Sequence, residues 1–182
     1  LYRLAGDGSA ATSAYLYSPN AVWMSSMGEL YIADTNNHRI RKVASTNGTS
    51  IITTFAGMGS QTCTSATSYT CGMSGSATDS VPATSSYLNS PSGIAGDTMG
   101  NVYIADTNNH RIRKVNSGGI IETIAGSASG AYTLDNIGGT SAVVYSPYGL
   151  YVTTDGYLYF TEIYRHIVRK LSPLGILRHV AG

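Results

Sequence analysis

The chain has 182 residues and a formal net charge of +1, and charged residues make up 12% of it. This share is about half of the usual value of roughly 25%, so the composition argues against a broad positive field that collects nucleic acid. No apolar run approaches the roughly 20 residues that a membrane-spanning helix requires, and the sequence therefore predicts no membrane span.

One motif recurs three times along the chain. Residues 28–43 read GELYIADTNNHRIRKV, residues 100–115 read GNVYIADTNNHRIRKV, and residues 156–171 read the less similar GYLYFTEIYRHIVRKL. A Ser-Pro pair precedes each copy, and an Ala-Gly pair follows it. A repeat of this length predicts an array in which each unit covers the apolar face of its neighbour.

Each unit predicts four short antiparallel strands, because β-branched and aromatic residues dominate four runs that turn residues separate. In the first unit the predicted strands are 21–24, 30–33, 39–43 and 51–56. In the second unit they are 93–96, 102–105, 111–115 and 120–125. In the third unit they are 149–152, 158–161, 167–171 and 176–181. Residues 1–6 also end in Ala-Gly, so we expect them to form the outer strand of a preceding unit.

A turn of short polar residues lies between the second and third strands, and such side chains favour turns because they bond to nearby backbone. We predict a structural role for the turn residues Asp34, Asn36, Asn37, His38, Asp106, Asn108, Asn109 and His110. The third unit departs from this pattern, since Glu162-Ile163-Tyr164-Arg165 replaces Asp-Thr-Asn-Asn.

Four antiparallel strands per unit describe one blade of a β-propeller. The motif GNVYIADTNNHRIRKV, with Pro-Ser-Gly-Ile-Ala before it, resembles the NHL-repeat family over nearly the whole chain apart from the loops. The resemblance implies an all-β propeller of four-stranded antiparallel blades, usually six in number, of which three are present here. The predicted segments are an outer strand at 1–6, blade one at 16–57, a Ser/Thr-rich insert loop at 58–87, blade two at 88–126 and blade three at 144–182.

Three blades form an open arc, which leaves two sheet faces uncovered. We expect the arc to be half of a six-bladed ring, completed by further blades of the same parent chain or by copies of itself. A head-to-tail contact between copies closes a ring or extends a filament.

Two features of the loops favour an extracellular protein. Cys63 and Cys71 are the only cysteines, and we expect a disulfide between them, although two unrelated free thiols are the alternative. Asn47-Gly48-Thr49 is an N-glycosylation sequon at a predicted turn. With the low charge, they predict a secreted or cell-surface glycoprotein.

The aligned histidines His38, His110 and His166 could suggest a metal site, but blades fan outward and should hold them apart. The same separation argues against acid–base work by the aligned carboxylates, which we expect to pair with local arginines. Eight of the eleven basic residues lie in the third strands, where we expect the aliphatic stems to pack and the charged heads to reach water. We therefore predict no catalytic residue, no metal and no cofactor.

The sequence favours a non-catalytic extracellular structural module that binds protein or glycan, with a building block of a surface filament as its most concrete form. One alternative is a propeller enzyme of the lyase or hydrolase type with a metal near the axis. The other is an RNA-binding NHL propeller, which the low net charge disfavours, so we predict no nucleic-acid partner.

Overall fold

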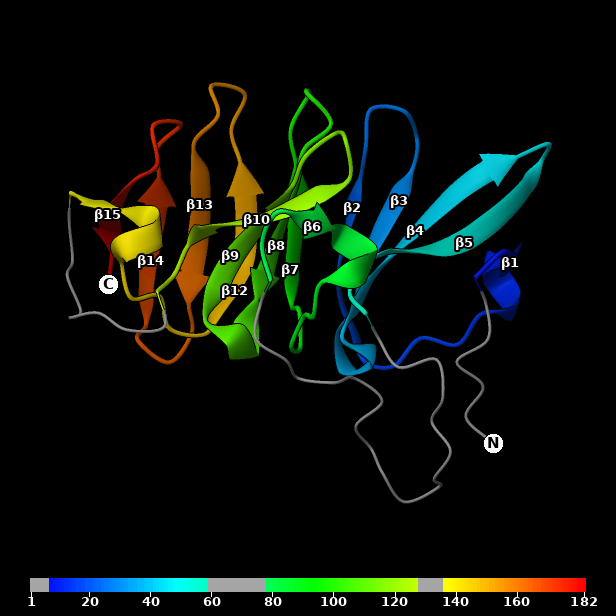
Figure 1. Cartoon of the computed structure of the whole chain (residues 1–182), viewed down its shortest axis with the longest axis horizontal. Coiled ribbons are helices and arrows are strands. Elements are labelled where there is room, and N and C mark those ends of the chain that lie inside the picture. The colour runs from blue at the N-terminus through cyan, green and yellow to red at the C-terminus, as the bar shows by residue number, and fades with distance from the viewer. Residues whose placement is uncertain (1–6, 59–77, 128–135) are drawn as a thin grey trace, which may run out of the picture.

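The computed structural model describes residues 7–58, 78–127 and 136–182, which form three five-stranded antiparallel sheets that stand side by side (Figure 1). Sheet 1 has the order β1 (Ser9–Ala10), β5 (Thr49–Ala56), β4 (Arg39–Thr46), β3 (Leu30–Asp34) and β2 (Pro19–Met24). Sheet 2 has the order β6 (Val81–Pro82), β10 (Ile120–Ala125), β9 (Arg111–Val115), β8 (Val102–Asp106) and β7 (Gly93–Gly96). Sheet 3 has the order β11 (Ile137–Gly138), β15 (Ile176–Ala181), β14 (Ile167–Leu171), β13 (Leu158–Glu162) and β12 (Pro147–Val152).

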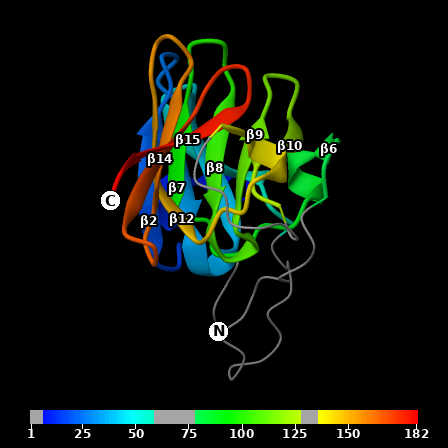
Figure 2. The ribbon, with the colours of Figure 1, turned by 90° about the vertical axis from the view of Figure 1, so that its left-hand side faces the viewer.

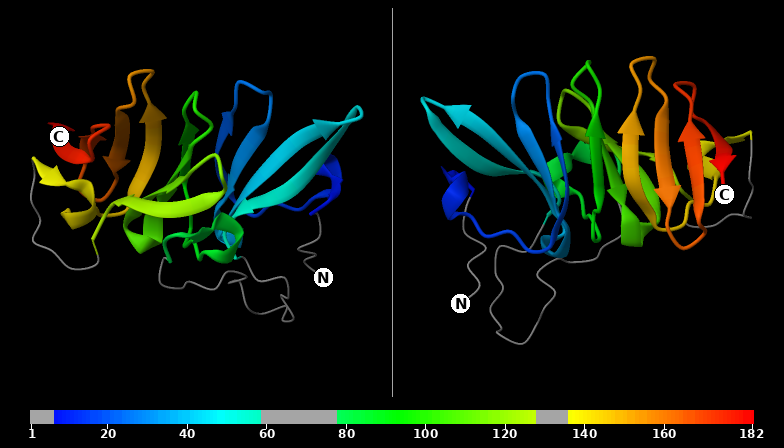
Figure 3. Two further views of the ribbon diagram at one scale, coloured as in Figure 1. Left: turned by 45° about the horizontal axis from the view of Figure 1, so that its top comes forward. Right: turned by 180° about the vertical axis from the view of Figure 1, so that it is seen from behind.

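The three sheets fan out from a common edge, as the blades of a propeller do. The first long strand of each sheet lies on that edge, where β7 contacts both β2 and β12. Figure 2 shows β2, β7 and β12 together on one side of the molecule, and Figure 3 shows the sheets following one another as an arc. No helix long and apolar enough to cross a membrane occurs in the described part of the chain.

The all-β prediction is confirmed, and the strands agree closely with the predicted ones. Strands β7, β9, β10, β14 and β15 have the predicted bounds, while β2 and β12 begin two residues earlier, at the proline. The hairpin β4–β5 is longer than predicted and extends beyond its counterparts (Figure 3).

Each sheet contains a fifth strand that the four-strand prediction lacks. This two-residue strand comes from the segment before the Ser-Pro pair, and a short 3₁₀ turn follows it: η1 (Ala11–Ser13), η3 (Ala83–Ser85) and η5 (Gly139–Ser141). Part of the predicted insert loop 58–87 therefore belongs to sheet 2. The outer strand predicted at 1–6 lies outside the described residues.

The core lies between the sheets. Between sheets 1 and 2 it contains Tyr31, Ile40, Ile94, Ile104 and Ile121. Between sheets 2 and 3 it contains Ile112, Ala125, Leu158, Phe160 and Leu177. Because each sheet buries its apolar side chains against a neighbouring sheet, the stability of one blade depends on the next.

Candidate functional site

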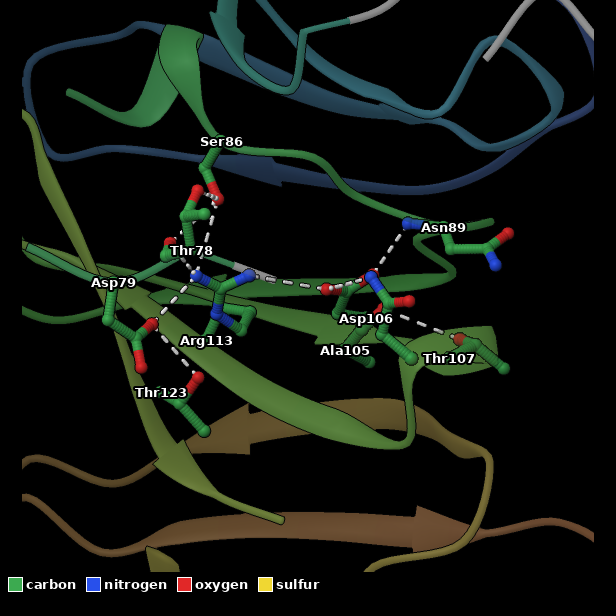
Figure 4. A network of polar contacts seen from close by, with 10 residues as sticks. Thr78, Asp79, Ser86, Asn89, Ala105, Asp106, Thr107, Arg113 and Thr123 are labelled. Carbon is green, nitrogen blue, oxygen red and sulfur yellow. Dashed lines mark hydrogen bonds and ion pairs between the residues drawn. The ribbon is translucent and has the colours of Figure 1, made fainter. Parts of the chain in front are cut away.

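A buried ion pair anchors the polar turn of sheet 2 (Figure 4). Asp106 and Arg113 are both fully buried, and Nη1 of Arg113 lies 3.4 Å from Oδ2 of Asp106. The backbone N–H of Asn89 donates to Oδ1 of Asp106 at 2.7 Å, and Nδ2 of Asn109 donates to Oδ2 at 2.9 Å. Nη2 of Arg113 donates to the carbonyl of Thr78 at 2.7 Å. The carboxylate thus ties the turn to the segment that enters the sheet.

The same arrangement recurs in the other two sheets. In sheet 1, Asp34 accepts the backbone N–H of Tyr17 at 2.7 Å and lies 3.9 Å from Nη1 of Arg41. In sheet 3, Glu162 accepts the backbone N–H of Tyr145 at 2.8 Å and pairs with Arg169 at 3.1 Å.

The expectation that the charged heads of the third-strand arginines reach water is wrong for Arg41, Arg113 and Arg169. All three are buried, because each head meets a buried carboxylate of the neighbouring strand, and such pairing is what lets a charge leave water. Burial raises the pKa of Asp106 to about 6, although the hydrogen bonds from Asn89 and Asn109 and the charge of Arg113 oppose this rise. Burial also raises the pKa of Asp34.

A second set of contacts joins sheet 1 to sheet 2. The turn η2 (Thr35–Asn37) ends at His38, which has a left-handed backbone with φ of 53°. Nδ1 of His38 accepts the backbone N–H of Ser90 at 2.8 Å, and the hydroxyl of Thr35 donates to the carbonyl of Pro91 at 2.7 Å. We call this pair of hydrogen bonds the inter-blade latch. One blade supplies the histidine and the threonine, and the next blade supplies the Ser-Pro backbone.

The latch recurs between sheets 2 and 3. The turn η4 (Thr107–Asn109) ends at His110, whose Nδ1 accepts the backbone N–H of Ser146 at 3.0 Å. The hydroxyl of Thr107 donates to the carbonyl of Pro147 at 2.8 Å. Here the imidazole of His110 also stacks on the ring of Tyr145, with the centroids 4.8 Å apart and the planes 9° from parallel. Burial lowers the pKa of both His38 and His110, which favours the neutral imidazole that can accept at Nδ1.

Each end of the arc carries one half of a latch. At the first end, Ser18 has the same left-handed backbone as Ser90 and Ser146, but Ser18 and Pro19 are exposed, whereas Ser146 and Pro147 are buried. At the last end, the turn of sheet 3 keeps His166 at φ of 57°, and this histidine is exposed.

The apolar side chains of the two end faces are also exposed. The pairing registers show that Val22 takes the position of the buried Ile94, and that Tyr151 takes the position of Trp23. Val22 is 64% exposed and Ile94 only 5%. Tyr151 is 66% exposed, whereas Trp23 is partly buried and packs against the core between sheets 1 and 2. Met24 on the first face and Val180 on the last are also exposed, at 61% and 46%, and neighbouring exposed apolar side chains of this kind indicate an interaction surface.

The structure also shows the contacts and exposure of the asparagines that the sequence analysis named. Asn36 and Asn108 donate through Nδ2 to Ser18 and Ser90 at 2.9 and 3.0 Å. Asn37 donates to Asp34 at 2.9 Å. Asn47 is exposed at the tip of the hairpin β4–β5.

Cys63 and Cys71 lie outside the described residues, so their predicted disulfide stays a prediction. Within residues 7–58, 78–127 and 136–182, no three His, Cys, Asp or Glu side chains come together in a way that suits a metal ion. Sequence reasoning missed the cross-blade roles of Thr35, Ser90 and Pro91, although the recurrence of Ser-Pro before each motif was a visible signal.

These sheets, turns and latches define a β-propeller built from repeated antiparallel blades. The model of the Teneurin NHL domain family matches residues 49–139, half of the chain, and the NHL repeat model matches residues 16–43. The chain belongs to the NHL-repeat β-propeller family.

Relatives match this chain over only a small part of their own length. Teneurin-3 of Danio rerio is 38% identical over 104 residues, which are 55% of this chain and 4% of that protein. Protein SUPPRESSOR OF QUENCHING 1, chloroplastic, of Arabidopsis thaliana is 30% identical over 176 residues, which are 92% of this chain and 15% of that protein.

Solved structures share the fold at low sequence identity. An auxiliary nutrient binding protein from Bacteroides ovatus superposes with a TM-score of 0.62 at 17% identity, over 87% of this chain and 37% of that one. Virginiamycin B lyase from Staphylococcus aureus superposes with a TM-score of 0.53 at 16% identity, over 90% of this chain and 41% of that one. At these identities the likeness concerns the fold alone.

Proposed function

We propose that the chain is a non-catalytic extracellular interaction module, a three-blade portion of a propeller that binds further blades through its two end faces. The observation that carries the proposal is a difference in solvent exposure between side chains at equivalent positions of different blades. Trp23 and Phe55 are partly buried and pack against the core between sheets 1 and 2, whereas Tyr151 and Val180, their counterparts on sheet 3, are 66% and 46% exposed.

The first end face also exposes a side chain whose counterpart is buried between blades. Val22 and Met24 are 64% and 61% exposed on β2, while Ile94, the counterpart of Val22, is buried against sheet 1. Both faces therefore carry the apolar side chains of a blade-to-blade contact. Half of a six-bladed ring, and a building block of a surface filament, are the two assemblies that this arrangement supports most simply.

An enzymatic role has weaker support. The aligned carboxylates Asp34, Asp106 and Glu162 each pair with an arginine of their own sheet, and the imidazoles of His38 and His110 bind backbone N–H groups. These groups hold the fold together, which leaves them poorly placed to act on a substrate.

An RNA-binding role also has weaker support. Arg41, Arg113 and Arg169, three of the basic residues in the third strands, are buried, which removes them from any phosphate-binding surface.

The extracellular location rests on Asn47 and the cysteine pair. Asn47 is exposed in a hairpin tip, which is a suitable place for an N-linked glycan. Expression in a secreting eukaryotic host should give a protein whose mass falls on treatment with an N-glycosidase, and Asn47→Gln should abolish that change. A secreted protein without glycan at Asn47 would contradict the glycoprotein part of the proposal.

Binding of a glycan has one specific observation in its favour. A groove of about 450 Å³ opens between sheets 1 and 2, and Trp23, Tyr31 and Phe55 line it together with the polar residues Ser25 and Asn116. Aromatic rings beside hydroxyl and amide groups suit a sugar ring. A glycan array should then show binding that Trp23→Ala removes; binding unchanged in this variant would exclude the groove.

The main proposal is tested with end-face variants. The immobilised chain is screened against extracellular proteins, including NHL propellers, and each binder is measured again with Val22→Asp and Tyr151→Asp. We expect affinity to fall in one or both variants and to stay unchanged in Leu174→Asp, since Leu174 is 90% exposed on a hairpin turn of sheet 3. Binders that tolerate both end-face variants would overturn the proposal.

A further inference from the structure

We infer that the first end face of this chain docks on the last end face of a second copy, through the histidine–serine hydrogen bond of an inter-blade latch, formed by His166 of one copy and Ser18 of the other, with Tyr17 stacked on the histidine. This inference rests on the proposed function, because it names the partner of the same end faces.

The two internal latches give the template for this junction. In both, a histidine with a left-handed backbone accepts the N–H of a serine that is followed by proline, at 2.8 and 3.0 Å. In the latch between sheets 2 and 3, the residue before that serine is Tyr145, and its ring stacks on His110.

The first end face carries the serine half of this template in its Tyr-Ser-Pro form. Residues 17–19 read Tyr-Ser-Pro, as residues 145–147 do, whereas residues 89–91 read Asn-Ser-Pro. The ring of Tyr17 is 42% exposed, and the backbone of Ser18 has φ of 50°, close to the 45° of Ser146. The segment is therefore already shaped to receive a stacked histidine.

The last end face carries the histidine half. His166 is exposed and has φ of 57°, against 53° and 56° for His38 and His110. Ile163 stands where Thr35 and Thr107 stand in the other turns, so the hydroxyl that would bind the proline carbonyl is missing. The junction between copies therefore has one hydrogen bond fewer than each internal latch.

The apolar side chains beside the latch are complementary in the same register. Trp23 and Phe55 pack with Ile94 between sheets 1 and 2. Their counterparts Tyr151 and Val180 would pack with Val22 of the second copy. Because the surfaces are different on the two partners, the contact is head-to-tail and either closes a ring or continues as a row.

The test measures the mass of the purified chain by sedimentation equilibrium over a range of concentrations. We expect reversible association of the wild-type chain, weaker by about fivefold or more in His166→Ala and in Tyr17→Ala, and stronger by about fivefold in Ile163→Thr, which restores the missing hydroxyl. Leu174→Ala, on an exposed turn of sheet 3, should behave as the wild type. Thermal unfolding of each variant shows whether the fold is intact.

A mixing experiment tests the head-to-tail geometry. His166→Ala keeps the serine half intact and Tyr17→Ala keeps the histidine half, so an equimolar mixture should associate more strongly than either variant alone and stop at two chains. A wild-type chain that stays monomeric, or an Ile163→Thr variant that gains no affinity, would overturn the inference. Either result would leave the proposed function intact if the binding screen still found blades that bind through Val22 or Tyr151. If that screen also failed, both the inference and the proposed function would be wrong.

Discussion

The backbone N–H of Ser90 in sheet 2 donates to Nδ1 of His38 in sheet 1, across the boundary between two blades. Ser146 and His110 repeat this relationship across the next boundary. A side chain at the end of a 3₁₀ turn thus satisfies a backbone donor of the following blade. Because N–H groups withdrawn from water need partners, the polar turn of one blade and the Ser-Pro segment of the next blade act together at both boundaries.

Removal of a latch histidine should destabilise the arc. His110→Ala leaves the N–H of Ser146, a buried residue, without its acceptor, and we expect a loss of about 1–3 kcal/mol in the free energy of unfolding. Ser90 is less buried than Ser146, so His38→Ala should cost less. Urea unfolding of the two variants measures both values, and a loss at His38 larger than at His110 would contradict this ranking.

The latches should make stability depend on pH. The pKa of His38 and of His110 is lowered in the folded chain, so the unfolded chain binds more protons as the pH falls. The stabilisation is therefore complete above about pH 6.5 and is lost as the pH falls below it. His38→Gln/His110→Gln keeps an acceptor that does not titrate, and its stability should change less between pH 7.5 and 5.5.

The buried carboxylates change the stability with pH in the opposite direction from the histidines. They are present in both the wild type and the double histidine variant. The raised pKa of Asp106 gives stability that is lost as the pH rises through about 6, and this contribution cancels in the comparison. Urea midpoints at a series of pH values provide the measurement. Parallel curves for the wild type and the double variant would contradict a role for the histidines.

Loss of the buried carboxylate of sheet 2 should be more severe than loss of any latch. Asp106→Ala leaves Arg113 buried beside two unpaired donors, the N–H of Asn89 and the amide of Asn109, and we expect a loss of about 3–5 kcal/mol. Asp79 also pairs with Arg113, at 2.9 Å, but its side chain is 42% exposed. Asp79→Ala should therefore cost less than about 1 kcal/mol. Equal losses in the two variants, measured by urea unfolding, would show that burial does not decide the outcome.

A close contact between Trp23 and Gly96 fixes the packing of sheets 1 and 2. A Cβ atom on Gly96 would collide with Cη2 of Trp23, so the indole requires a glycine there. The next boundary has Ala95 and Val152 at the same two positions. Gly96→Val alone should destabilise by about 1–3 kcal/mol, whereas Trp23→Ala/Gly96→Val should recover part of that loss. A double-mutant cycle measured by thermal unfolding gives the coupling energy between the two positions. A coupling energy of zero would show that the two residues do not contact each other.

The long strands could be predicted because their apolar residues recur in three copies with the same turn residues between them. The two-residue strands β1, β6 and β11 are too short to show any alternation, although an Ala-Thr-Ser or Gly-Thr-Ser sequence follows each of them and marked their place. The carboxylate–arginine pairs could be predicted from alignment of the copies. The burial of Arg113 and the latch from Thr35 to Pro91 could not, because both depend on how one blade packs against a segment far away in sequence.

The most direct test of the central claim, that the end faces are interaction surfaces, is the oxidation of methionines by hydroxyl radicals with readout by mass spectrometry. Met24 lies on the first end face and is 61% exposed, while Met27 and Met99 lie on hairpin turns and are 85% and 74% exposed. When the chain is assembled with its partner, we expect oxidation of Met24 to fall several-fold and oxidation of Met27 and Met99 to stay unchanged. Met24 that remains as reactive as Met27 in the assembled protein would contradict the account.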